Sequence, residues 1–208
     1  MENFDVVVVG AGTGGCATAI ALAQKGIKVA LVDRKKKEDI GKKVCGDATS
    51  YSYFDRMAKE GCKVDKPKGD EVLQSIEGAY IASPNNKTFL PIDMEEGKGC
   101  IVNRHVFGQR LLHNAEDAGA VVFPETHALD LVIKDEHPQA VTIRREGKKE
   151  DLRCKVIVDC SGVSTALRRK VVDYSKEELG FEKVIDDRDM VYGYREIRKL
   201  TVPLEFPH

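Results

Sequence analysis

Tryptophan is absent from this sequence of 208 residues, and aromatic residues make up only 6% of it. No apolar run approaches the roughly 20 residues that a membrane-spanning helix needs, and the N-terminal stretch lacks the basic region and cleavage site of a signal peptide. A basic excess is missing too: 33 Lys+Arg stand against 34 Asp+Glu, a formal net charge of -1. Nucleic-acid binding normally requires such an excess. We therefore expect a globular cytoplasmic protein, or one at a membrane face without crossing it, that has no nucleic-acid partner.

Cysteine is also sparse and scattered. The six cysteines include no pair with CxxC spacing, and the five histidines form no HxxH or HxxxH pattern. A disulfide scaffold and a zinc site are both disfavoured, so we expect no metal. Cys16, Cys154 and Cys160 lie in apolar segments and are expected to be small core residues in a reducing compartment.

The beginning of the chain has the pattern of a β-α-β unit. A β-branched run at residues 6–9, without polar alternation, predicts a strand buried on both faces. A glycine-rich loop follows, then an alanine-rich helix over residues 16–25 that Gly26 ends, and a second apolar strand at residues 27–32. Asp33 stands at the end of that strand. The unit is complete within 33 residues.

The loop between the first strand and the helix has the GxGxxG spacing of a dinucleotide site. Gly10 allows the tight turn, Gly12 lets the backbone approach a pyrophosphate, and Gly15 lets the helix pack on its strand. Asp33 lies 23 residues after Gly10, at the position of the acid that binds a ribose 2′-OH. A carboxylate there disfavours NADP despite the neighbouring Arg34. The alternative is that the glycines only make a tight turn. The expected cofactor-binding residues of this unit are Gly10, Gly12, Thr13, Gly14, Gly15, Asp33 and Arg34.

Further along, the patterns predict a mixture of helices and short strands. Helices are expected at residues 53–59, 104–118 and 165–170, and a hairpin at 79–82 and 88–92. Other strands are expected at 120–123, 128–134, 140–145, 152–159 and 189–200. The fold class is a doubly wound, Rossmann-like α/β domain for FAD or NAD(P) with an antiparallel second sheet. We assign residues 1–75 and 100–172 to the dinucleotide domain, and 76–99 and 173–208 to part of a substrate-binding sheet domain.

The segment at residues 156–168 favours a flavin over a nicotinamide. Gly162, Thr165 and Arg168 have the spacing of a second fingerprint, and this segment resembles that of the p-hydroxybenzoate hydroxylase superfamily of flavoproteins. Ser161 replaces the Asp usual in the hydroxylases, a departure that their reductase relatives share. The resemblance implies that Gly162 and Arg168 bind the cofactor.

The loop at residues 43–48, with the sequence KVCGDA, points to one branch of that superfamily. It resembles the KxCGDA segment of the geranylgeranyl reductase family, which includes archaeal digeranylgeranylglycerophospholipid reductases. Asn103 and Arg104 begin a helix similar to that family's VxR helix, whose Arg lies beside the flavin. The resemblance extends from Phe4 to about Arg168, and weakly through residues 192–195.

The resemblance implies an FAD enzyme that reduces isolated double bonds of geranylgeranyl chains in membrane lipid biosynthesis. It implies an isoprenoid lipid substrate, an external electron donor and contact with a membrane face. Cys45 is expected near the flavin ring and, with Asp47, is a candidate catalytic residue; the alternatives are an inert loop cysteine and a simple turn former. Arg104 and Arg168 have the alternative of solvated surface charges. The further cofactor-binding residues that we assign are Cys45, Gly46, Asp47, Ala48, Arg104, Ala128, Gly162 and Arg168.

Two motifs of the family do not occur in the sequence, and family members are roughly twice as long. The later Gly-Asp-Ala fingerprint and the aromatic YxWxFP segment are both missing. We therefore expect an N-terminal portion, which is a fragment, a split-gene product or a truncated form; one alternative is that a partner chain supplies the other half. On this expectation the chain binds the AMP half of FAD but does not hold the ring or catalyse turnover alone.

Two other functions stay open at this point. One is an FAD-dependent aromatic hydroxylase, which the Cys45-Gly46-Asp47 loop and Ser161 argue against. The other is a non-catalytic nucleotide-binding fragment that acts with a partner chain. A plain NAD dehydrogenase has the least support, because no catalytic His or Lys–Tyr arrangement of that class is recognisable.

Overall fold

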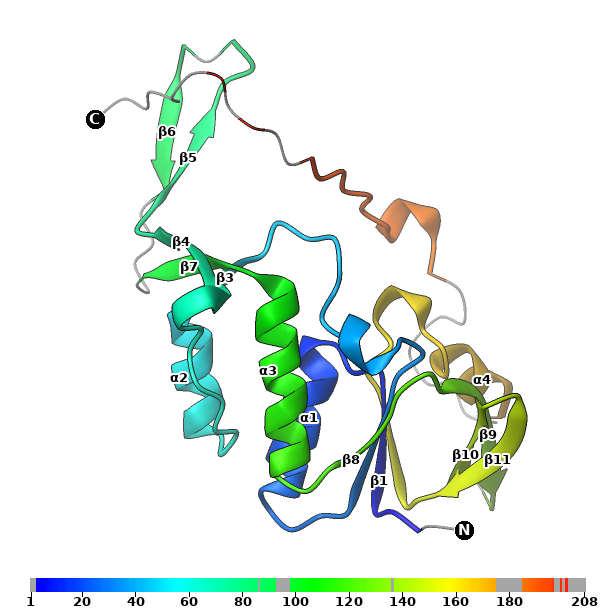
Figure 1. The fold of residues 1–208 in the computed structure, drawn as a ribbon. Coiled ribbons are helices and arrows are strands. Elements are labelled where there is room, and N and C mark those ends of the chain that lie inside the picture. The colour runs from blue at the N-terminus through cyan, green and yellow to red at the C-terminus, as the bar shows by residue number, and fades with distance from the viewer. Residues whose placement is uncertain are drawn as a thin grey trace.

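A parallel sheet of four strands forms the centre of the fold (Figure 1). The computed structural model describes residues 3–85, 87–92, 98–135, 137–174, 185–196, 199 and 201. The sheet order is β12-β1-β2-β8, and the strands are β1 (Val6–Val9), β2 (Val29–Val32), β8 (Val121–Phe123) and β12 (Val156–Asp159). Val9 pairs with Asp159 on one side and with Val32 on the other, so three strands end at the same level. This confirms the α/β fold class.

Side chains of the central strands alternate between two cores. Val6 and Val8 of β1 pack into one hydrophobic cluster, whereas Val7 and Val9 pack into a second cluster on the opposite face. All four are buried, as the unbroken β-branched run predicts.

Helices cover one face of this sheet. They are α1 (Thr13–Ala23) and α3 (Arg104–Asp117), and α2 (Tyr51–Lys59) packs on α3, where Phe54 contacts Phe107. In α3, Phe107, Leu111, Leu112 and Ala115 are buried at helical spacing against α1 and the sheet.

An antiparallel sheet covers the opposite face, so the molecule has three layers (Figure 1). Its strands are β9 (His127–Lys134), β10 (His137–Arg145) and β11 (Lys148–Arg153), and the helix α4 (Arg168–Tyr174) lies beside them. Val141, Ile143 and Leu152 pack into the second core with Val7 and Val9.

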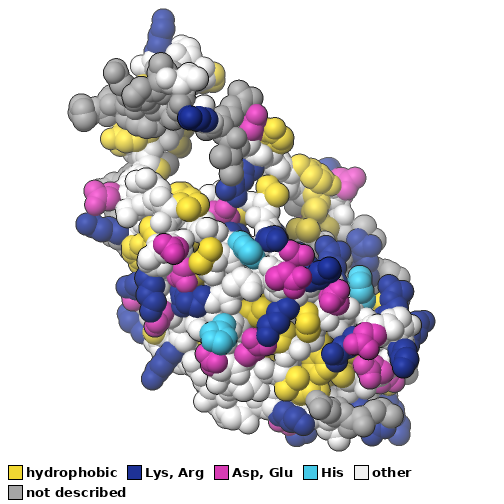
Figure 2. Space-filling model, in the orientation of Figure 1, with side chains coloured by type: hydrophobic (Ala, Val, Ile, Leu, Met, Phe, Trp, Pro, Cys, Tyr) yellow, Lys and Arg dark blue, Asp and Glu magenta, His cyan; other side chains and the backbone are white. Residues whose placement is uncertain are grey.

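Two smaller sheets complete the described chain. One has the order β3-β7-β4, formed by β3 (Ala48–Ser50), β7 (Gly99–Val102) and β4 (Val72–Ile76). The other is the predicted hairpin of β5 (Ala79–Ala82) and β6 (Phe89–Ile92), which extends away from the body of the molecule (Figure 1). On the face drawn in Figure 2, acidic and basic side chains are interspersed.

Three expectations about the elements were wrong. The strand expected at residues 152–159 is two strands, because the chain passes at Cys154 and Lys155 from the antiparallel layer to the parallel sheet. Of the strand expected at residues 189–200, the described residues 189–196 form no strand, and residues 197, 198 and 200 lie outside the described residues. The helix expected at residues 165–170 begins only at Arg168. No helix among the described residues is long and apolar enough to cross a membrane.

Candidate functional site

The glycine loop lies where β1 ends, beside the second fingerprint segment. A Cβ at Gly10, whose φ is +102°, would lie 2.5 Å from the Cys160 carbonyl oxygen, and a Cβ at Gly15 would lie 1.7 Å from the Gly10 carbonyl oxygen. A Cβ at Gly12 would meet no described atom within 4 Å. Gly10 and Gly15 are therefore required for packing within the chain, whereas the space above Gly12 is open to a ligand.

Asp33 connects this loop to the end of β2. Its Oδ2 accepts a hydrogen bond of 2.7 Å from the Ala11 N–H, and its Oδ1 accepts one of 2.8 Å from the Lys35 N–H. Each carboxylate oxygen can accept a further hydrogen bond, so a ribose hydroxyl remains a possible partner.

A cavity of about 400 Å³ opens over the ends of β1 and β2 and continues to the start of β9. Thr126 on its wall is buried, and its N–H donates to the Asp33 carbonyl oxygen at 2.9 Å. The lining includes Gly10, Gly12, Asp33, Arg34, Lys35, Lys43, Thr126, Ala128, Ser161 and Gly162. The two fingerprint segments, more than a hundred residues apart in the sequence, thus share one cavity with Ala128.

Asp159 shapes the second fingerprint segment. Its Oδ1 accepts from the Ser161 N–H at 3.0 Å, and its Oδ2 accepts from the N–H groups of Leu167 at 3.0 Å and Arg168 at 3.1 Å. Gly162 within the segment has a φ of +69°. The carboxylate thus fixes the path of the chain from β12 to α4, and Arg168 is the first residue of that helix.

Two more hollows continue from this cavity toward the KVCGDA loop. A small one of about 70 Å³ at the start of α1 has Gly12, Asp33, Lys35 and Lys43 in common with the first cavity. A larger one of about 500 Å³ has Lys42, Lys43 and Arg104 in common with the small one. The three hollows are neighbours with shared walls, and together they are called the groove below. No side chain caps the N-terminus of α1 within it, since the cap residue is Gly12.

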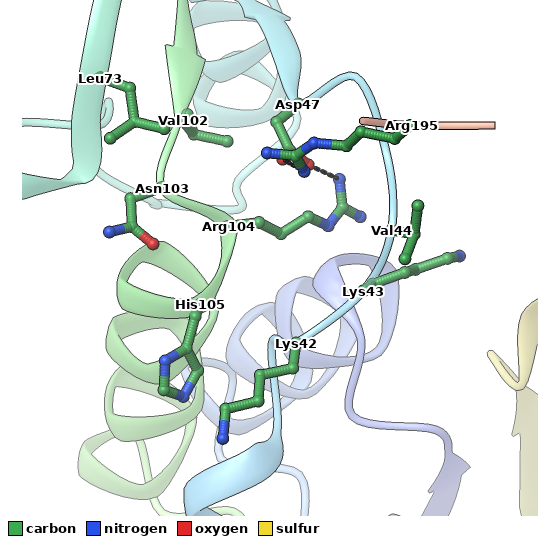
Figure 3. Close-up of a pocket in the computed structure, with 10 residues that line it drawn as sticks. All are labelled: Lys42, Lys43, Val44, Asp47, Leu73, Val102, Asn103, Arg104, His105 and Arg195. Carbon is green, nitrogen blue, oxygen red and sulfur yellow. Dashed lines mark hydrogen bonds and ion pairs between the residues drawn. The ribbon is translucent and has the colours of Figure 1, made fainter. Parts of the chain in front are cut away.

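Asp47 lies at the far end of the groove between two guanidinium groups (Figure 3). It is 3% exposed and has a φ of +62°. Arg195 Nη1 donates to Oδ2 at 2.5 Å, and Arg104 Nη1 lies 3.8 Å from Oδ1. Arg104 also reaches back to α1, where its Nη2 lies 3.4 Å from Thr13 Oγ1. The site therefore has a buried carboxylate that links distant segments.

Cys45, Gly46 and Ala48 flank Asp47 in the same loop. Cys45 and Gly46 are exposed, and the Cys45 carbonyl oxygen accepts a hydrogen bond of 2.9 Å from Arg195 Nη1. The structure thus places Asp47 of the KVCGDA loop beside Arg104, whereas Lys43 at the start of the loop lines the same cavity as Asp33.

The cysteines at the parallel sheet, Cys16, Cys154 and Cys160, differ in their burial. Burial, together with smaller effects of the nearby Asp33 and Cys160, raises the pKa of the Cys16 thiol to about 12. Its Sγ donates to the Ala11 carbonyl oxygen at 3.3 Å, beneath the glycine loop. Cys16 and Cys154 are buried core residues as expected, whereas Cys160 is only half-buried.

Several residues of the groove were missed by the motif analysis. Lys35, Lys42 and Thr126 line it without belonging to a fingerprint, and Asp159 acts through its hydrogen bonds to the backbone. Arg195 is 148 residues from Asp47. No local pattern in the sequence indicates such a contact.

The fold and the groove define the class of protein. The family model described as "FAD dependent oxidoreductase" matches residues 5–179. The chain belongs to this family, and its cofactor is FAD.

Among curated proteins, the chain is similar to archaeal digeranylgeranylglycerophospholipid reductases. It is 31% identical to that of Sulfolobus acidocaldarius over 197 residues, which are 94% of this chain and 41% of the relative. It is 30% identical to that of Methanothrix thermoacetophila over 196 residues, which are 88% of this chain and 48% of the relative. The chain thus spans less than half the length of these relatives.

Solved structures show the same fold. A geranylgeranyl bacteriochlorophyll reductase-like protein from Thermoplasma acidophilum superposes with a TM-score of 0.71 and 26% identity, covering 85% of this chain and 43% of that one. A flavin-dependent brominase superposes with a TM-score of 0.68 at 21% identity, covering 82% of this chain and 41% of that one. The second similarity shows the fold alone.

Proposed function

We propose that this chain forms the FAD-binding part of a reductase that saturates double bonds in the geranylgeranyl chains of membrane lipids. The observation that carries this proposal is the KVCGDA loop at the end of the groove, beside Arg104. Relatives with 31% and 30% identity carry the name of such a reductase.

The groove fits an extended dinucleotide diphosphate. Asp33 would accept a hydrogen bond from the ribose at one end. The uncapped start of α1 and the open space above Gly12 would receive the diphosphate. Lys42, Lys43 and Arg104 line the groove beside it and would balance its negative charge. The flavin end would then lie toward Asp47.

The chain's own residues have positioning roles in this proposal. Once an external donor had supplied two electrons, the reduced flavin would give a hydride to one carbon of the double bond, and a proton would add to the other carbon. Asp47 and Arg104 would orient the flavin end of the groove. Cys45, exposed in the same loop, would lie near the ring and is the candidate for contact with the reacting region.

Other parts of the proposal concern the substrate side. We assign residues 76–99, which include the hairpin β5–β6, and residues 173–208 to the substrate-binding sheet domain. The substrate would be an isoprenoid lipid reached by contact with a membrane face, and a partner chain would supply the other half of the enzyme. Much of the segment 173–208 lies outside the described residues.

The direct test is turnover with a defined lipid. The purified chain is loaded with FAD, reduced with dithionite without oxygen, and incubated with digeranylgeranylglycerophospholipid. The incubation is repeated with the separately expressed part of the Sulfolobus acidocaldarius reductase that this chain does not match. Mass spectrometry then measures the addition of two hydrogens per double bond.

The proposal predicts saturated lipid in the incubation that contains both polypeptides. A Gly12→Ala chain is the control, because it should fold and yet, at limiting FAD, give less saturated lipid. FAD binding without saturation under either condition would contradict the proposal. Oxygen-dependent hydroxylation of an aromatic compound would instead favour the hydroxylase alternative.

A further inference from the structure

Arg195 joins two segments that are far apart in the sequence. It belongs to residues 185–196, which run between α4 and the hairpin β5–β6 (Figure 1). Its Nη1 donates both to the Cys45 carbonyl oxygen at 2.9 Å and to Asp47 Oδ2 at 2.5 Å. Arg195 Nη1 therefore contacts both the main chain of Cys45, just before Gly46, and the side chain of Asp47, just after it.

Asp47 is held in a position where its buried negative charge would be unfavourable without a nearby cation. Its carbonyl oxygen accepts a hydrogen bond of 2.9 Å from the Val102 N–H in β7, so its backbone cannot easily move away. Its φ of +62° is unusual for a residue with a side chain. The carboxylate is 3% exposed, and a buried carboxylate requires a partner of opposite charge. Arg195 supplies that partner.

Arg104 has contacts in two directions. Its Nη1 lies 3.8 Å from Asp47 Oδ1, which has no hydrogen-bond partner within the described part of the chain. Its Nη2 lies 3.4 Å from Thr13 Oγ1 at the start of α1. Figure 3 shows both guanidinium groups beside the carboxylate of Asp47. If Arg195 were removed, the carboxylate would attract Arg104 more strongly and draw it away from α1.

We propose that Arg195 is a positioning residue of the FAD site, which acts through Asp47 to keep Arg104 directed at the start of α1. It also holds the loop at residues 42–46, where Cys45 is exposed. This inference rests on the FAD site and not on the identity of the lipid substrate. It makes Arg195 a functional part of the cofactor site, although this residue belongs to neither fingerprint.

The test uses the whole chain with Arg195→Gln and Arg195→Lys. Arg188→Gln is the matched control, because Arg188 lies in the same segment, is exposed and forms an ion pair with its neighbour Asp186. The first measurement is the rate of tryptic cleavage after Lys42 and Lys43 without nucleotide, mapped by mass spectrometry. The second is the dissociation constant for FAD. We expect Arg195→Gln to raise both by about tenfold, and Arg188→Gln to change neither by more than about twofold.

Arg195→Lys should restore part of the FAD affinity, because an ammonium group retains the charge that Asp47 requires. A further comparison with Asp47→Asn separates positioning from general destabilisation. Without the carboxylate, Arg195→Gln should have little additional effect on FAD binding. An undiminished effect in the Asp47→Asn background would overturn the proposal, because Arg195 would then act independently of Asp47.

Unchanged proteolysis and unchanged FAD affinity in Arg195→Gln would also overturn it. A folded chain that takes up no FAD would count against the cofactor site itself. In that case the tryptic cleavage rates of the nucleotide-free chain would still decide whether Arg195 holds the loop.

Discussion

Alanine at position 15 should destabilise the protein strongly, because the added methyl group meets backbone atoms. A Cβ there would lie 1.7 Å from the carbonyl oxygen of Gly10 and 2.9 Å from its carbonyl carbon. Neither atom can rotate away, so α1 would have to move from the end of β1. Overpacking of this kind costs about 1–3 kcal/mol. We expect the upper end, about 3 kcal/mol, out of a total stability of about 5–15 kcal/mol.

Alanine at position 14 is the matched control, one residue earlier in the same helix. A Cβ there would meet no described atom within 4 Å. Because alanine favours a helix over glycine by about 1 kcal/mol, Gly14→Ala should leave the fold as stable as before or slightly more stable. The two variants should therefore differ by about 3–4 kcal/mol in their free energy of unfolding.

Alanine at position 12 should weaken cofactor binding but change the stability of the fold only slightly. Its Cβ would also find open space in the chain, but that space is where the diphosphate of FAD is proposed to lie. Gly12→Ala should lower the stability by less than about 1 kcal/mol, because Gly12 is an N-cap residue. The same methyl group against a diphosphate should weaken FAD binding at least about tenfold.

Urea unfolding followed by far-UV circular dichroism measures the stabilities, since the chain has no tryptophan to report by fluorescence. Flavin fluorescence measures FAD binding. Equal stability of Gly15→Ala and Gly14→Ala would refute the close packing of α1 on the glycine loop. Undiminished FAD binding by Gly12→Ala would refute the proposed place of the diphosphate.

Three further predictions concern charge and thiol chemistry. Arg110→Gln should lower the free energy of unfolding by about 3 kcal/mol, because it leaves the buried Glu71 without its bidentate partner. The control is Arg145→Gln at an exposed ion pair, which should change the free energy of unfolding in urea by less than about 1 kcal/mol. Iodoacetamide at pH 8, read out by mass spectrometry, should modify the exposed Cys45 well before Cys16 and Cys154, because burial raises the pKa of those thiols to about 12 and about 11. Labelling of Cys16 at the rate of Cys45 would contradict this. The free energy of unfolding should fall as the pH rises above the ordinary thiol pKa of 9.0 toward 12, because Cys16 ionises there in the unfolded chain but stays neutral in the folded chain. Cys16→Ala should reduce this pH dependence, measured by urea titrations at pH 8 and 10.

The elements predicted best are those whose signal is local. The β-branched run of β1, the glycine loop and the second strand follow one another without interruption, and each is fixed by its own residues. In contrast, β3, β4 and β7 were not predicted. They are short, and much of β4 is exposed, so only the pairing across the sheet makes them strands.

The errors have a similar origin. Residues 152–159 read as one strand because apolar residues recur through them, but the chain changes sheets within the segment at Cys154 and Lys155. Residues 190–196 have the composition of a strand, yet a strand also needs a neighbouring edge, and no described strand provides one. Composition alone does not contain that information.

The residues of the candidate site also fall into two groups, those with a local sequence signal and those without one. Glycines and the acid at the end of β2 were found because their spacing reflects the shape of a dinucleotide. Arg195 could not be found, because its contact with Asp47 depends on the path of the chain over 148 residues. The place of the domain boundaries and the roles of Cys45 and Asp47 stay predictions.

The most direct test of the account is a titration of the purified chain with FAD and with ADP, which corresponds to the adenosine diphosphate half of the cofactor. The account predicts that FAD binds with one molecule per chain, that ADP competes for the same site, and that Gly12→Ala weakens both. A folded chain that binds neither nucleotide, or that binds ADP without displacing FAD, would contradict a single FAD groove running from Asp33 to Asp47.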